Sequence, residues 1–404
     1  MSVRSFVYFF RAFAFTGLEN VLPQSFFLRR LAGLPHTTWL LSLALLLGAV
    51  CSLLGLWCSR WLALAARSWP PGARLFPIVL GVMCTGSFDK LVTGHSSATY
   101  FVFVALTAFL LEALFNALDN GYVQRSGLEG TASHVRGATV LQLLGILFAP
   151  FYFSFFMTDV HWTFMVVTVL GLVFTAIAAG TFNPVVRVKT TFQSMSLTPF
   201  ERRFLIYALC MFAATVMMAS MTIVVIQNDY HLPHPVEWGG AIIGVTNAVG
   251  ILTVLLFARR ARVSPVSDTA GSRLVTRVLA PCAFMILICV LVILLRWSDT
   301  YGYLFFVSIF TGVSYGVFQN FSRLVASRRS LGSANAGLLT LYNSIASAGS
   351  LLAFLSLALA ATLVSPSGYP YAALLMMAVY LAIGGVSVMG LTRGQPLAES
   401  HALP

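Results

Sequence analysis

The chain has 404 residues, of which 58% are hydrophobic and only 9% are charged. Soluble domains usually carry about 25% charged residues, so the composition excludes a water-soluble fold. The formal net charge of +12 could suit a nucleic-acid-binding protein, but most basic residues lie in short segments between long apolar runs. This distribution is typical of membrane proteins and requires no polyanionic partner.

Twelve apolar segments are long enough to cross a bilayer, which takes about 20 residues as a helix. Backbone polar groups must be paired in hydrocarbon, and these runs are continuous rather than alternating, so we expect helices and not a barrel. Arg11 and Glu19 interrupt the first segment, which we interpret as an uncleaved span rather than a signal peptide. The predicted spans are 5–28, 37–58, 75–94, 98–122, 137–157, 161–182, 204–227, 237–257, 278–296, 301–322, 334–364 and 369–391.

The basic residues predict the orientation. Only Arg29, Arg30, Lys90 and Arg296 fall in segments that would face outward if the N-terminus lies in the cytoplasm. All inner segments except the tail are clearly richer in basic residues, which predicts cytoplasmic N- and C-termini. The inner residues are Arg60, Arg67, Arg74, Arg125, Arg136, Arg187, Lys189, Arg202, Arg203, Arg259, Arg260, Arg262, Arg273, Arg277, Arg323, Arg328, Arg329 and Arg393.

A polar stretch in the middle of the chain divides the spans into two sets of six. We predict an N-terminal six-helix bundle at 1–182, a cytoplasmic linker at 183–203, a C-terminal bundle at 204–392 and a tail at 393–404. Two six-helix halves with a site between them near the bilayer midplane are a known transporter plan.

Three short motifs support this interpretation. Gly55 to Arg60 keeps the first Gly and one Arg of the G-x-x-x-D-R-x-G-R-R loop, with Ser59 in place of the Asp. Gly145 to Pro150 is close to a G-x-x-x-G-P element, and Glu19 to Pro23 is an acidic residue followed by Pro within the first span. In topology and in these motifs the chain resembles the major facilitator superfamily over essentially its full length, and its drug/proton antiporter branches most.

The resemblance implies an all-α membrane fold of two pseudo-symmetric six-helix bundles that moves a solute by alternating access. It also implies gating roles for Gly55, Arg60, Gly145 and Pro150. The chain departs from the antiporter branches because its fourth span holds no Arg. Glu112, Asn116, Asp119 and Asn120 in that span, followed by a turn at His134–Gly137, are instead similar to proton symporters of sugars and nucleosides.

Ionisable residues inside the bilayer are costly to insert, which makes them functional candidates. Helix rise places Glu19 and Glu112 near mid-bilayer, and Arg11 and Asp119 closer to the cytoplasm. We predict that Arg11 pairs with Asp119 or Glu112. Because burial disfavours a charged carboxylate, we further predict that one of the mid-bilayer acids couples transport to proton movement, Glu19 first and Glu112 second. The alternative is a static network that holds the N-terminal half together.

The second half is nearly free of charge in its spans and is predicted to shape the solute site. A buried amide or phenol needs a partner, so polar residues there are candidates for solute contact, although packing is an alternative for each aromatic side chain. The candidates are Asn116 from the first half and Asn247, Tyr315, Gln319, Tyr342 and Asn343 from the second.

These observations predict a secondary transporter in a bacterial inner membrane. We expect proton-coupled export of a small amphiphilic organic solute by a monomer, and the alternative is a symporter that imports a sugar, nucleoside or metal-chelating compound. A sensor that kept the transporter fold is a third possibility, although it would have little need for mid-membrane charges. No P-loop, dinucleotide-binding Gly motif or nucleophile elbow is present, so we expect no enzyme activity and no cofactor. We also expect no metal site at His231 and His234, because neighbouring Pro residues prevent a helix from aligning them.

Overall fold

A computed structural model describes residues 6–14, 46–47, 49–58, 97–155, 197–230, 235–257, 268–295, 300–332, 338–365 and 368–391, and their regular structure is entirely helical. Seven of these helices are long and apolar enough to cross a membrane. The elements are α1 (Phe6–Ala14), α6 (Ser97–Phe155), α8 (Pro199–Asp229), α9 (Pro235–Phe257), α10 (Asp268–Leu294), α11 (Tyr303–Gly332), α12 (Leu338–Leu363) and α13 (Tyr369–Met389), with a shorter helix at Ala49–Cys58.

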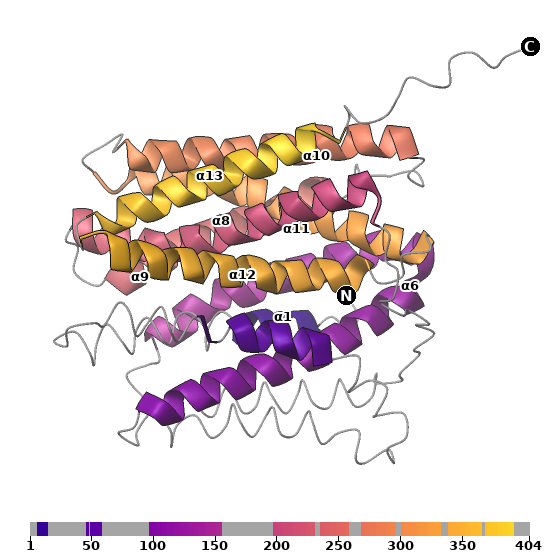
Figure 1. Cartoon of the computed structure of the whole chain (residues 1–404), viewed down its shortest axis with the longest axis horizontal. Coiled ribbons are helices and arrows are strands. Elements are labelled where there is room, and N and C mark those ends of the chain that lie inside the picture. Colours follow the sequence, from indigo (N-terminus) through magenta and orange to yellow (C-terminus); the bar gives the residue numbers. More distant parts are fainter. Residues whose placement is uncertain are drawn as a thin grey trace, which may run out of the picture.

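The long helices lie side by side along one direction (Figure 1). The turn of α6, the start of α8 and the end of α13 lie at the same end of the bundle, which is the end that the sequence predicts to face the cytoplasm. Helices cover the predicted fourth, fifth and seventh to twelfth spans, whereas the predicted third and sixth spans lie outside the described residues.

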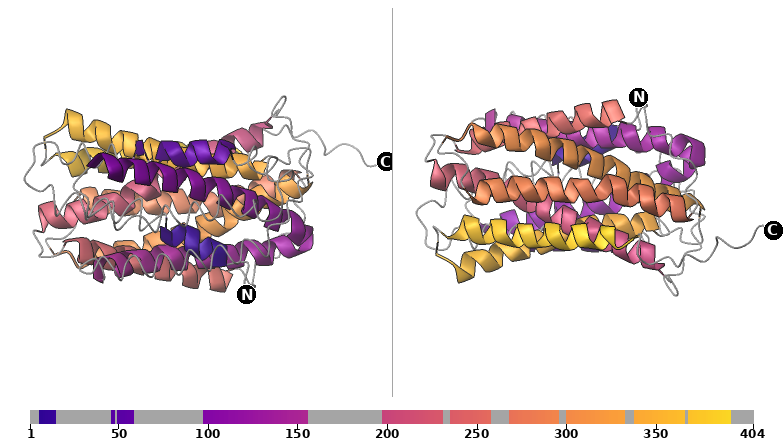
Figure 2. Two further views of the ribbon diagram at one scale, coloured as in Figure 1. Left: turned by 90° about the horizontal axis from the view of Figure 1, so that it is seen from below. Right: turned by 90° about the horizontal axis from the view of Figure 1, so that it is seen from above.

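Helix α6 combines the predicted fourth and fifth spans, and its two arms meet in a sharp turn (Figure 2). Gly127 makes this turn with a φ of 63°, a left-handed conformation that favours glycine. The hydroxyl of Ser126 donates to the carbonyl of Val123 at 2.8 Å, and Thr131 donates to the carbonyl of Gly127. The predicted turn at His134–Gly137 is therefore wrong, because these residues are helical and the chain reverses earlier.

Helix α8 begins inside the predicted linker. Thr198 forms a capping box in which its backbone N–H donates to Glu201 Oε2 at 2.9 Å, and its hydroxyl accepts from the Glu201 N–H at 3.2 Å. Pro199 fits the first turn because no helical partner exists for an N–H there. The residues from 199 to 203 are thus helical.

Replacing Thr198 with Ala is expected to lower the free energy of unfolding by about 1 kcal/mol, because the N-cap acceptor is lost. Thermal unfolding in detergent measures the change, and Thr198→Ser, which keeps the hydroxyl, is the matched control. An unchanged melting temperature in the Ala variant would show that the cap adds nothing here.

Helix α11 runs ten residues further toward the cytoplasm than its predicted span, to Gly332. The prediction that places Arg323 in a cytoplasmic loop is wrong, because Arg323 is a helical residue that is only 6% exposed. The apolar composition of α11 falls in its last third, which is why the sequence predicts an earlier end.

The second half is packed around α8, which contacts α12 and α13, while α10 contacts α11 and α13. Helices α9 and α11 approach closely at Gly250 and Gly316, where a Cβ on Gly316 would lie 2.6 Å from the Gly250 carbonyl oxygen. Small residues allow such close packing in membranes. Among the described helices of the first half, α6 packs against α9, α11 and α12 of the second half. Helix α6 therefore forms a large part of the described contact between the halves.

Candidate functional site between the two halves

Asp119 on α6 is the centre of a buried polar cluster between the halves, which we call the Asp119 cluster (Tyr8, Asn116, Asp119, Arg323 and Asn343). Its carboxylate is 0% exposed and accepts three hydrogen bonds. They come from the Tyr8 hydroxyl at 2.6 Å, the Arg323 Nη2 at 2.5 Å and the Asn343 Nδ2 at 3.1 Å. A buried carboxylate needs such donors because it has left its hydration shell behind.

Arg323 is the partner of Asp119 from the opposite half. Its Nη1 also donates to Gln142 Oε1 at 3.3 Å, and its guanidinium lies over the Tyr8 ring, 4.8 Å from the centroid. The Asp119–Arg323 ion pair thus joins α6 to α11, and Asn343 adds a link to α12. Sequence reasoning did not predict Arg323 or Tyr8 as site residues.

Arg11 and Glu112 form a second ion pair, this time within the first half. Arg11 Nη2 lies 2.6 Å from Glu112 Oε1, and the guanidinium lies 4.3 Å from the Phe115 ring centroid. The prediction that Arg11 pairs with Asp119 or Glu112 is met by Glu112. Glu112 and Asp119 each form an ion pair, so neither is the carboxylate that was predicted to lack a full-time partner. Glu19, the first candidate for that role, lies outside the described residues.

The Asp119 cluster lies toward the predicted cytoplasmic side. Asp119 is eight residues from the α6 turn at Gly127, or about 12 Å along the helix, and Asn343 is about 8 Å from the start of α12. The cluster therefore links the halves within two to three helical turns of that side.

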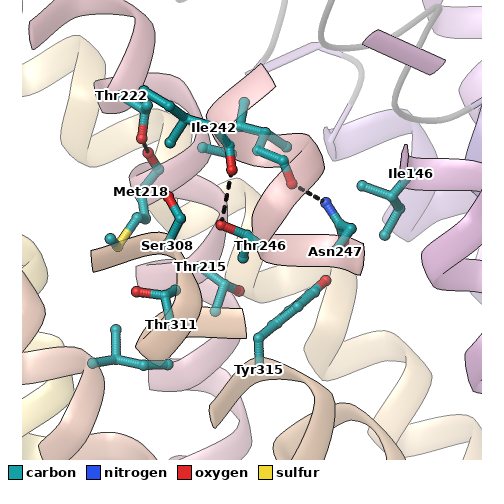
Figure 3. A pocket seen from close by; sticks show the side chains of 13 residues that line it. Ile146, Thr215, Met218, Thr222, Ile242, Thr246, Asn247, Ser308, Thr311 and Tyr315 are labelled. Carbon is teal, nitrogen blue, oxygen red and sulfur yellow. Dashed lines mark hydrogen bonds between the residues drawn. The ribbon is translucent and has the colours of Figure 1, made fainter. Parts of the chain in front are cut away.

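A cavity of about 570 Å³, counting the solvent at its mouth, lies further from that side, mainly within the second half (Figure 3). Its described lining mixes apolar side chains with hydroxyl groups, and none of these described residues is charged. Most of the hydroxyls donate to the carbonyl one turn earlier in their own helix, for example Thr246 to Ile242 at 3.2 Å. The lining residues are Ile146, Thr215, Met218, Ala219, Thr222, Ile242, Ile243, Thr246, Asn247, Ile286, Ser308, Thr311 and Tyr315.

Asn247 is the amide in this cavity and is 2% exposed. Its Nδ2 donates to the Ile243 carbonyl at 2.8 Å, whereas its Oδ1 has no hydrogen-bond partner among the described residues. Figure 3 shows the Tyr315 side chain extending toward Asn247 from α11. An unpaired buried amide oxygen is costly unless a ligand or water completes it.

The structure divides the predicted solute residues into two places. Asn247 and Tyr315 line the cavity, whereas Asn343 Nδ2 donates to Asn116 Oδ1 at 3.1 Å within the Asp119 cluster. Tyr342 shares a 2.6 Å hydrogen bond with Ser322 and stacks on Phe204. Gln319, 8% exposed, lies one turn before Arg323 on α11.

The predicted gating residues are only partly described. Gly55 and Gly145 both lie at close helix contacts: a Cβ on Gly55 would overlap the Phe109 carbonyl, and one on Gly145 would lie 2.8 Å from the Phe13 nitrogen. Arg60 lies outside the described residues, as does the side chain of Pro150. Within the described part of the chain, no three His, Cys, Asp or Glu side chains are grouped as metal ligands.

Several solved structures share this fold over nearly the whole chain. The human organic anion transporter MFSD10 aligns with a TM-score of 0.66 at 14% identity, covering 96% of this chain and 98% of that one. A bacterial homologue of the iron transporter ferroportin, in an outward-facing state, aligns at 0.63 with 14% identity over 97% and 100%. The nucleoside transporter NupG aligns at 0.63 with 12% identity over 98% and 100%.

No protein-family model matches the sequence, and no curated protein matches it either. The likeness to solved structures is thus one of fold. The described part of the chain is helical, with seven helices able to cross a membrane, and the chain shares the fold of these transporters.

Proposed function

We propose that the protein is a secondary transporter that works by alternating access, with the Asp119 cluster as its cytoplasmic gate. The observation that carries this proposal is the ion pair between Asp119 and Arg323, which joins the two halves on one side of the cavity. A pair that only stabilised the fold could lie within one half, as Arg11 and Glu112 do. For solute to pass, the Asp119–Arg323 pair has to break in each cycle.

We propose a neutral or weakly polar amphiphile as the solute. The cavity offers Ile and Met side chains for apolar contact, and its hydroxyls are mostly used within their own helices. A fully charged solute would find no counter-ion among the described lining residues and would lose its hydration. Asn247 Oδ1 is suited to accept one hydrogen bond from a hydroxyl or amine of the solute.

We propose proton coupling through the buried acids, and export as the direction. Protonation of Asp119 would remove one charge of the gate pair, which gives a proton a direct influence on opening.

Export is supported by the antiporter-like elements at Glu19–Pro23 and Gly145–Pro150. Import by a proton symporter is the second candidate, supported by Asp119 late in the fourth span. We place the protein in the bacterial inner membrane as a monomer.

The test of coupling and direction is flux in proteoliposomes under an imposed pH gradient, with a panel of neutral, cationic and anionic amphiphiles together with sugars and nucleosides. Export predicts that an inward proton gradient drives amphiphiles out against their own gradient. Sugar or nucleoside accumulation with the proton gradient would favour the symporter. No gradient-dependent flux for any compound would contradict the transporter proposal.

Replacing Asn247 with Leu is expected to raise the KM for the transported solute up to about tenfold, because one hydrogen bond to the solute is lost. The maximal rate should change little, since the gate is untouched. Thr253→Val is the matched control: Thr253 is buried on the same helix, donates to the Val249 carbonyl and does not line the cavity. An equal KM in the Leu variant and the wild type would remove Asn247 from the solute site.

A further inference from the structure

A line of hydrogen bonds runs from Asp119 on the first arm of α6, through Tyr8 on α1, to His134 on the second arm of α6. The Tyr8 hydroxyl lies 2.6 Å from Asp119 Oδ1 on one side and 3.0 Å from His134 Nε2 on the other. Asp119 and Tyr8 are 0% and 1% exposed, whereas His134 is only partly buried. One phenol therefore connects the buried acid of the cluster with an imidazole that is only partly buried.

The donors and acceptors in this line can be assigned. A phenol has one proton and the ionised carboxylate can only accept, so Tyr8 donates to Asp119. The phenol oxygen must then accept from His134, which requires a proton on Nε2. All three groups are thus arranged head to tail, the geometry through which a proton can be passed along a chain.

The neighbouring groups fix this geometry. The Tyr8 ring packs edge-on against His134, with centroids 5.7 Å apart, and Tyr122 packs against His134 at 6.2 Å. Arg323 from α11 covers the Tyr8 ring, and Asn343 from α12 binds the other oxygen of Asp119. The titratable or charged groups around His134 are therefore Tyr8 on α1, Asp119 and Tyr122 on the first arm of α6, and Arg323 on α11.

We propose that His134 and Tyr8 form the route by which Asp119 exchanges protons with the cytoplasm. An imidazolium at His134 gives its Nε2 proton to the Tyr8 oxygen while the Tyr8 proton moves to Asp119 Oδ1. His134 is left neutral, Tyr8 is unchanged and Asp119 becomes neutral. Resetting the line requires the Tyr8 hydroxyl to rotate back toward Asp119 and one proton from water to return to His134 Nε2. A neutral Asp119 no longer forms an ion pair with Arg323, which is the step that the proposed function links to opening of the gate.

This inference rests on the proposed function, because it assumes that Asp119 protonation opens the cytoplasmic gate. The proton route determines how fast Asp119 is protonated. The equilibrium between the closed and the open gate is determined mainly by the Asp119–Arg323 pair. The opposing possibility is that the Tyr8 hydroxyl simply holds the gate closed. The two possibilities predict opposite changes in the rate of opening. Loss of a hydrogen bond that holds the gate closed makes opening faster, whereas loss of the proton route makes it slower.

The experiment is a rapid acidification of the full-length protein in lipid nanodiscs, without solute. A donor and an acceptor fluorophore are attached at Leu128→Cys on the exposed α6 turn and Arg202→Cys on the exposed start of α8, with the native cysteines replaced. Energy transfer reports the separation of the two cytoplasmic ends. Tyr8→Phe, which keeps the ring contacts, and His134→Gln, which keeps a donor to Tyr8, test the route.

We expect both variants to separate at least tenfold more slowly than the wild type. Thr139→Val, which alters a buried hydroxyl one turn beyond Val135 on the same arm, should leave the rate unchanged. Opening at the wild-type rate or faster in Tyr8→Phe and His134→Gln would overturn the proton route. Asp119→Asn mimics the neutral, protonated carboxyl group. If this variant showed no separation at any pH, the proposal that Asp119 controls the gate would be wrong, and the proton route would be wrong with it.

Discussion

Replacing Arg323 with Gln is expected to destabilise the protein by about 3–5 kcal/mol and to abolish gradient-driven transport. The substitution leaves the fully buried Asp119, which is 0% exposed, without a compensating charge. An unpaired buried ion is far more costly than the buried pair. Thermal unfolding in detergent measures the stability, and flux in proteoliposomes measures transport.

The double variant Asp119→Asn with Arg323→Gln is the matched control for this prediction. It removes both charges and keeps groups of similar shape, so most of the lost stability should return. Proton-dependent transport should not return, because no carboxylate remains at the gate. If the double variant were as unstable as Arg323→Gln alone, the charge of Asp119 would not explain the loss.

Replacing Gly145 with Ala is expected to lower gradient-driven transport at least tenfold and stability by about 1–3 kcal/mol. An added Cβ would lie 2.8 Å from the Phe13 backbone nitrogen and 3.0 Å from the Ala12 Cβ, so α1 has to move away from α6. Helix α1 carries Tyr8 and Arg11, and both ion-pair clusters depend on its position. One methyl group would therefore disturb the gate from a distance.

Gly137→Ala separates this packing effect from the general effect of removing a glycine. Gly137 lies on the same arm of α6, but a Cβ there would meet nothing within 4 Å. The control should be as active as the wild type and slightly more stable, since Ala favours a helix over Gly. Equal activity in both Ala variants would show that α1 tolerates the displacement.

Much of the fold could be predicted from the sequence because long, continuous apolar segments cross a membrane as helices, which pair all their backbone polar groups. The ends of the helices were harder to predict. Arg323 lies close to Arg328 and Arg329, and their spacing alone predicts one basic loop that holds all three. What places Arg323 inside the protein is Asp119, which is 204 residues away. A partner at that distance leaves no local signal.

The candidate site could be predicted where the signal in the sequence is local. A partner for Arg11 on the fourth span could be predicted because both spans hold ionisable residues, but helix rise alone places Asp119 closer in depth than Glu112, which is the actual partner. Tyr8 could not be predicted, although it lies three residues before Arg11 and thus near the same helix face, because one tyrosine among many aromatic residues carries no special signal. The glycine that closely follows His134 predicts a turn there, whereas Gly127 makes the turn.

The most direct test of alternating access is the distance between spin labels at Leu128→Cys and Arg202→Cys, measured at equilibrium in nanodiscs at neutral pH. A gate held by Asp119 and Arg323 predicts one short distance in the wild type and a large second population at longer distance in Asp119→Asn with Arg323→Gln. Glu201→Gln is the control, because Glu201 pairs with Arg329 at 3.8 Å within the second half, and Gln can keep the helix cap. That control should keep the short distance. Identical distance distributions in the wild type and the double variant would show that the Asp119–Arg323 pair does not close the cytoplasmic side.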